Sequence, residues 1–154
     1  REFFDGPIAL SGSISEGSSV LSALALGADF AYVGTKFIAT EEANASPGYK
    51  QMIIDSTAND IMYSATFTGV DGNYLRPSVV AAGLDPEEHT SGSKDDMNFS
   101  SSAIAKKDNS SKAWKDIWGS GQGIGSIKDA PSVEDAVDKM VEEYQEAKKR
   151  LDQF

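Results

Sequence analysis

The chain has 154 residues, 40% hydrophobic and 25% charged, a composition typical of one folded domain with a sizeable core. Its formal net charge of -10 argues against nucleic acid as a partner, because nucleic-acid affinity comes mainly from lysine and arginine side chains that neutralise phosphates. The absence of cysteine excludes disulfides, thiolate metal sites and cysteine nucleophiles. No apolar run approaches the roughly 18–20 residues that span a bilayer, so the sequence predicts a cytoplasmic protein with no membrane partner.

Two short apolar runs, residues 7–10 and 30–33, each predict a buried strand that ends in a turn of small residues. Between them, apolar residues at helical spacing predict a helix that ends at Gly27. The order strand, helix, strand predicts a βαβ unit with parallel strands. The predicted N-cap is Ser15, and the apolar face of this helix contains Val20, Leu21, Leu24 and Ala28.

The later elements are predicted from caps and periodicity. Ser46-Pro47 predicts the start of a helix, and residues 61–67 predict a half-buried strand. Residues 87–111 are rich in Ser, Asp, Asn and Lys and predict a long surface excursion. Ser132 and Asp135 predict a capping box at the start of a final amphipathic helix. The apolar stripe of that helix contains Val133, Val137, Met140, Val141, Tyr144 and Leu151.

Two of the predicted turns, Gly12-Ser13 and Gly34-Thr35, follow predicted parallel strands, so both lie at the carboxyl ends where ligands bind in α/β proteins. Small residues let a phosphate approach backbone N–H groups closely. Either turn alone is better explained by tight chain reversal. Their occurrence after two successive strands favours a shared phosphate-bearing ligand.

A third glycine-rich segment, residues 118–125, does not match G-x-G-x-x-G and follows no predicted strand, so a Rossmann fold is not supported. Two interpretations stay open. The segment is either a mobile loop whose backbone and Gln122 approach a cofactor, or a flexible connection to the final helix.

Several runs in this order closely resemble the last two βα units of nitronate monooxygenases, the 2-nitropropane dioxygenase-like family. They are Ser11-Gly12-Ser13-Ile14, Ala23 to Asp29, Val33 to Glu42, Ala45-Ser46-Pro47, Tyr49-Lys50, Phe67-Thr68-Gly69, Leu75-Arg76 and Gly121-Gln122-Gly123. The resemblance covers roughly residues 7 to 125. It implies an α/β fold that is the C-terminal part of a TIM (β/α)8 barrel with a C-terminal helical extension.

The resemblance also implies FMN as the cofactor. In the family, turns that match Gly12-Ser13 and Gly34-Thr35 bind the FMN phosphate through backbone amides, and Thr35 adds a hydroxyl contact. The segment that matches Gly121 and Gln122 lies beside the flavin. Ser13 departs from the family, which more usually has a second glycine there.

The expected organisation has three parts: residues 1–86 as the last βα units of the FMN-binding barrel, residues 87–125 as the polar excursion and glycine-rich flavin-side loop, and residues 126–154 as the C-terminal amphipathic helix. A complete barrel takes about 250 residues, so the chain is expected to be a fragment. Its expected partners are the missing N-terminal half or a homo-oligomer partner.

No catalytic residue is assigned, because the family's histidine base comes from the earlier half. His89, the one histidine, lies next to the polar stretch and receives no role, and no metal site is predicted. The expected activity is oxidation of a nitronate or nitroalkane substrate with dioxygen. The alternatives are a flavin-dependent enoyl-acyl-carrier-protein reductase and a non-catalytic flavin-binding or assembly fragment.

Overall fold

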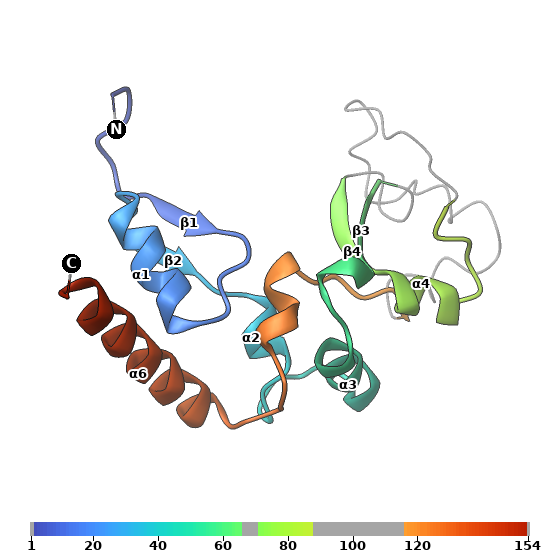
Figure 1. The fold of residues 1–154 in the computed structure, drawn as a ribbon. Coiled ribbons are helices and arrows are strands. Elements are labelled where there is room, and N and C mark those ends of the chain that lie inside the picture. The colour runs from blue at the N-terminus through green and yellow to red at the C-terminus, as the bar shows by residue number, and fades with distance from the viewer. Residues whose placement is uncertain (1, 66–70, 88–115, 154) are drawn as a thin grey trace. The chain divides into compact units, whose positions relative to one another are not determined.

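The computed structural model describes residues 2–65, 71–87 and 116–153 (Figure 1). The chain is an α/β protein that divides into two compact units, Arg1–Asp55 with Gln122–Phe154, and Ser56–Gly121. The boundaries between these units lie after Asp55 and after Gly121. The sequence predicts boundaries after residues 86 and 125 instead. The assignment of roles to those three segments stays a prediction.

The first unit begins with the predicted βαβ arrangement. Strand β1 (Ala9–Ser11), helix α1 (Gly17–Ala25) and strand β2 (Phe30–Tyr32) follow one another, and the two strands pair in parallel with Ala9 opposite Phe30. The predicted βαβ unit with parallel strands is therefore confirmed.

The prediction that these strands are buried is wrong for the described chain. Phe30 and Tyr32 lie on one face of β2, because alternate residues of a strand share a face, and they are 60% and 65% exposed. The described residues pair only two strands in this sheet and cover that face with no other element. The apolar composition of β2 therefore predicts that its side chains are buried, but no described residue covers them.

The ends of α1 show one wrong and one correct prediction. The N-cap is Glu16 rather than Ser15, and the backbone N–H of Glu16 donates to Ser19 Oγ at 3.2 Å. At the other end, Gly27 follows the C-cap and has a φ of +92°, a left-handed conformation that glycine adopts without steric cost. The predicted C-terminal glycine is confirmed.

The remaining helices of the first unit are α2 (Thr35–Ile38), α3 (Pro47–Asp55), the 3-10 helix η4 (Gln122–Ser126) and α6 (Val133–Leu151). Two predicted helix starts are confirmed. Ser46 Oγ accepts the N–H of Tyr49 at 3.2 Å, and Ser132 Oγ accepts the N–H of Asp135 at 3.0 Å. Lys50 on α3 holds the segment that follows α2. Its Nζ donates to the backbone carbonyls of Thr40 at 2.7 Å and Glu41 at 2.9 Å.

Helices α1 and α6 pack side by side (Figure 1), but not through the predicted apolar stripe of α6. The buried residues of α6 are Ala136, Met140 and Ala147. Of the predicted stripe, only Met140 is buried, whereas Val133, Val137, Val141 and Leu151 are between 37% and 56% exposed. The two helices approach closely at Gly17, where an added Cβ atom would lie 2.0 Å from Met140 O on α6.

The second unit holds η1 (Ala58–Asp60), β3 (Ile61–Ser64), β4 (Gly72–Leu75) and α4 (Arg76–Ala81). The strands β3 and β4 are antiparallel. The sequence predicted β3 and neither β4 nor α4, because glycine and proline there were interpreted as loop signals. Most of the predicted polar excursion, residues 88–111, lies outside the described residues.

Segment Trp118–Ser120 is held against the second unit's sheet. The N–H of Leu75 donates to Trp118 O at 2.8 Å, and the N–H of Ser120 donates to Asn73 O at 3.2 Å. Ser78 Oγ accepts the N–H of Trp118 at 3.0 Å. These three hydrogen bonds order the chain directly before Gly121.

Among the described residues, no helix is both long and apolar enough to cross a membrane.

Burial of Tyr49 on α3 predicts a pH effect on stability. Desolvation raises the pKa of the Tyr49 hydroxyl above its ordinary value of 10.0, because burial disfavours the phenolate. Above the ordinary pKa, the unfolded chain loses this proton while the folded chain keeps it, so the free energy of unfolding falls as the pH rises. Urea unfolding of the wild type and Tyr49→Phe from about pH 8 to about pH 11 should show a steeper decline in the wild type above about pH 10. Equal declines would contradict this prediction.

Candidate functional site

The two predicted phosphate turns lie at one edge of the β1–β2 sheet. Because the strands are parallel, with Ser11 opposite Tyr32, their carboxyl ends are level. Gly12 directly follows β1, and Thr35 is the first residue of α2, which starts shortly after β2. The structure thus brings both turns to the same edge, as the sequence predicts.

The first turn has an unusual backbone conformation. Gly12 has a φ of +104° and Ser13 a φ of +55°. The second value lies in the left-handed region, which costs a residue with a side chain about 1–2 kcal/mol relative to glycine. Such conformations cluster at ligand-binding sites, where the surrounding structure holds them. Glycine at position 13 would form this turn without that cost.

Each turn contains a glycine with open space beside its Cα atom. A Cβ atom added to Gly12 or to Gly34 would meet no heavy atom of the protein within 4 Å, and both glycines are exposed. The space that a side chain would fill is therefore available to a ligand at each turn. Small residues with open backbone suit a phosphate, whose oxygens accept from N–H groups. The residues present fit the phosphate end of a flavin nucleotide.

The third glycine-rich segment also reaches the first turn. A Cβ atom added to Gly123 would lie 2.6 Å from Ser15 Oγ and 3.0 Å from the Cα and carbonyl carbon of Ser13. Gly123 belongs to the 3-10 helix η4, whose Ile124 is fully buried, and the predicted approach of Gln122 to a cofactor stays a prediction. Of the two flavin-side residues predicted here, Gln122 opens η4, and Gly121 ends the second unit.

Sequence reasoning missed three residues near these turns. The place of Gly123 in the middle of Gly121-x-Gly123-x-Gly125 is a signal of close backbone packing that could have identified it. Ser15 is 3% exposed, and Lys36, next to Thr35, is 6% exposed. No local pattern distinguishes a buried lysine from a surface one, so only the structure identifies Lys36.

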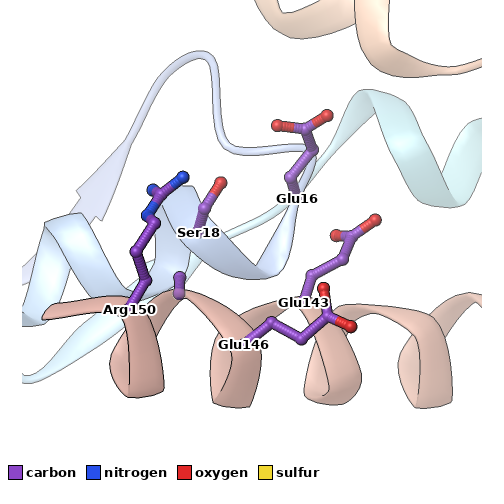
Figure 2. Close-up of a pocket in the computed structure, with 6 residues that line it drawn as sticks. Glu16, Ser18, Glu143, Glu146 and Arg150 are labelled. Carbon is purple, nitrogen blue, oxygen red and sulfur yellow. The ribbon is translucent and has the colours of Figure 1, made fainter. Parts of the chain in front are cut away.

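A cavity of about 340 Å³ lies elsewhere in the first unit, between the start of α1 and α6 (Figure 2). Its lining residues are Glu16, Ser18, Glu143, Glu146, Ala147 and Arg150. None of the six predicted cofactor residues lines it. The carboxylates of Glu16, Glu143 and Glu146 would repel a phosphate. This cavity is therefore not the candidate site for the flavin phosphate.

In the described part of the chain, no group of three or more His, Cys, Asp or Glu side chains is placed to hold a metal ion. His89 lies outside the described residues.

The fold and the site together define an α/β protein with paired glycine turns at the carboxyl ends of adjacent parallel strands. The chain belongs to the nitronate monooxygenase family, whose model matches residues 2–143. The nitronate monooxygenase of Paraburkholderia phytofirmans is 32% identical over 80 residues, which cover 52% of this chain and 22% of that relative. The resemblance inferred from the sequence is confirmed.

Two solved structures share the fold. The nitroalkane oxidase from Streptomyces ansochromogenes superposes with a TM-score of 0.71 at 26% identity, covering 98% of this chain and 43% of that one. FabK from Thermotoga maritima superposes with a TM-score of 0.73 at 22% identity, covering 97% and 48%. The chain thus spans less than half the length of each of these proteins.

Proposed function

We propose that the protein containing this chain is an FMN-dependent oxidoreductase that oxidises alkyl nitronates with dioxygen, and that this chain supplies the FMN phosphate site. The flavin, when bound, passes electrons from the substrate to oxygen. Membership of the nitronate monooxygenase family supports the reaction class. The observation that carries the phosphate site is the pair of open glycine turns at adjacent strand ends.

The chain's own residues bind and orient the cofactor. Backbone N–H groups of Gly12, Ser13, Gly34 and Thr35 would donate to the phosphate, and the Thr35 hydroxyl would add a contact. A doubly charged phosphate gains from several such donors at once, because hydrogen bonds to charged groups are stronger than neutral ones. Gly121 and Gln122 would lie along the flavin. The base that takes the substrate proton is assigned to no residue of this chain.

We propose further that β1 and β2 are the last two strands of a TIM barrel. Their parallel pairing through α1 supports this arrangement, and so does the likeness to the nitroalkane oxidase structure. The exposed face with Phe30 and Tyr32 would then line the barrel interior, which side chains fill in this architecture. The N-terminal half, or a second copy of the chain, would supply the partner surface.

The first test is flavin binding. The purified chain should quench the fluorescence of added FMN at saturable concentrations, and a flavin carried through purification should be released by denaturation and identified as FMN by chromatography. Tighter binding of FAD than of FMN would contradict the choice of cofactor. A well-folded chain that binds neither flavin would overturn the proposed site.

The second test is the reaction. Oxygen uptake with propyl-2-nitronate is expected from the complete protein loaded with FMN, and flavin reduction by the nitronate should precede it in stopped-flow measurements. NAD(P)H oxidation with an enoyl thioester, and no response to the nitronate, would favour the reductase instead. Flavin binding without either activity would leave a binding or assembly role.

A further inference from the structure

Helix η4 rests on the loop that follows β1 through a residue without a side chain. A Cβ atom at Gly123 would be 2.6 Å from Ser15 Oγ and 3.0 Å from two backbone atoms of Ser13. A Cβ atom at this position would therefore require the Ser15 hydroxyl to rotate away, and the backbone at Ser13 would have to give by a few tenths of an ångström.

Both partners of this contact are anchored. On the loop, Ile14 and Ser15 are buried, with exposed fractions of 7% and 3%. In η4, Ile124 is fully buried, and Ser126 Oγ donates to Gly123 O at 3.1 Å. The surface between them is therefore fixed on both sides, and it lies directly beside the left-handed backbone of Ser13.

We propose that Gly123 is a positioning residue, which holds Ser13 in the left-handed conformation that presents the first turn to the phosphate of the ligand. This inference rests on the proposed function of the same turn. Serine enters that region at a cost that glycine does not have, so the Ser13 conformation needs support from its neighbours. The backbone of Gly123 would provide that support without occupying the ligand's space, because η4 comes so close to Ser13 that a Cβ atom between them would be at 3.0 Å.

The test combines Gly123→Ala with Ser13→Gly in a double-mutant cycle, with FMN affinity as the measurement. In the wild-type background, Gly123→Ala is expected to weaken FMN binding by about tenfold, the size of one lost contact to a charged group. In the Ser13→Gly background the same change should cost less than about threefold, because glycine reaches the required conformation unaided. Gly125→Ala is the matched control, since its Cβ would meet nothing within 4 Å.

A purely structural role for Gly123 predicts a different result. Gly123→Ala would then weaken FMN binding equally in the wild-type and Ser13→Gly backgrounds, and this result would overturn the proposal. Unchanged FMN affinity in Gly123→Ala would overturn it as well. If Gly123→Ala unfolds, Gly123→Ala with Ser15→Ala removes the shortest contact and takes its place in the cycle. Backbone chemical shifts of Ser13 in the flavin-free chain give an independent measurement, and they should leave the left-handed range only in the Gly123 variant.

Failure of the proposed function is distinguishable from failure of this inference. A wild-type chain that binds no flavin overturns both, whereas a wild-type chain that binds FMN while Gly123→Ala binds it equally well overturns the positioning role alone.

Discussion

Gly17→Ala is expected to lower the free energy of unfolding by about 3 kcal/mol, the upper part of the range for forced overpacking. The added Cβ would lie 2.0 Å from Met140 O and 2.3 Å from the backbone nitrogen of Tyr144. Both atoms belong to the backbone of α6, so neither can rotate away. Relief of the clash requires α1 and α6 to separate.

Separation would also break a hydrogen bond between the two helices. The N–H of Gly17 donates to Glu143 Oε2 at 2.8 Å, so a carboxylate from α6 satisfies one of the free N–H groups at the start of α1. Negative charge is favourable at that helix end. The effect of Gly17→Ala on stability should therefore exceed that of Glu143→Ala, which removes the acceptor and leaves the packing intact.

Urea and thermal unfolding measure the effect, which corresponds to a fall in Tm of roughly 6–12 °C for a chain of this size. Gly125→Ala is the matched control, because its Cβ would have open space and because alanine restricts the unfolded chain. The control should match or slightly exceed the wild type in stability. A Gly17→Ala protein within about 0.5 kcal/mol of the wild type would show that α1 and α6 do not pack as described.

Gly34→Val is expected to weaken FMN binding by about 10- to 100-fold while leaving the fold intact. Position 34 has a negative φ of -115°, and a Cβ there would meet no protein atom within 4 Å. The valine side chain would occupy the space proposed for the phosphate. Loss of a hydrogen bond to a charged group costs about 1.5–3 kcal/mol, and about 1.4 kcal/mol is tenfold in Kd.

The series Gly34→Ala and Gly34→Val should show a graded loss of FMN fluorescence quenching at constant free energy of unfolding. Gly125→Val is the control, because Gly125 has the same open surroundings and no assigned contact with the flavin. Equal FMN affinity in the wild type and Gly34→Val would remove the second turn from the phosphate site. Riboflavin, which lacks the phosphate, should bind the wild type and the variant equally well.

Much of the local structure followed from the sequence, because local chemistry decides it. The cap formed by Ser132, the helix start at Pro47 and the left-handed Gly27 each depend on residues within one turn of the chain. The two strands with their glycine turns were identified in the same way, and parallel pairing then placed the turns at one edge. The sequence alone therefore predicts the four phosphate residues Gly12, Ser13, Gly34 and Thr35.

The predictions from sequence failed where a local pattern was a poor guide to the structure. The stripe of valines on α6 has correct helical spacing, yet the helix buries Ala136, Met140 and Ala147, and its backbone at Met140 and Tyr144 lies against Gly17. Strand β4 and helix α4 were missed because Gly72 and Pro77 are also common in loops. For α4 the local signal itself was ambiguous, because Pro77 lies in the first turn of the helix, where proline is also favoured.

By itself, the sequence determined the family, the βαβ order and the two glycine turns, since these depend on residue identity and short-range spacing. Only the tertiary structure decided that Ser13 is left-handed, that Gly123 rests on its backbone, and that Gly17 joins α1 to α6. The last two contacts join residues more than one hundred positions apart. Periodicity and capping rules describe one segment at a time, so they cannot specify which backbones approach so closely that only glycine fits between them.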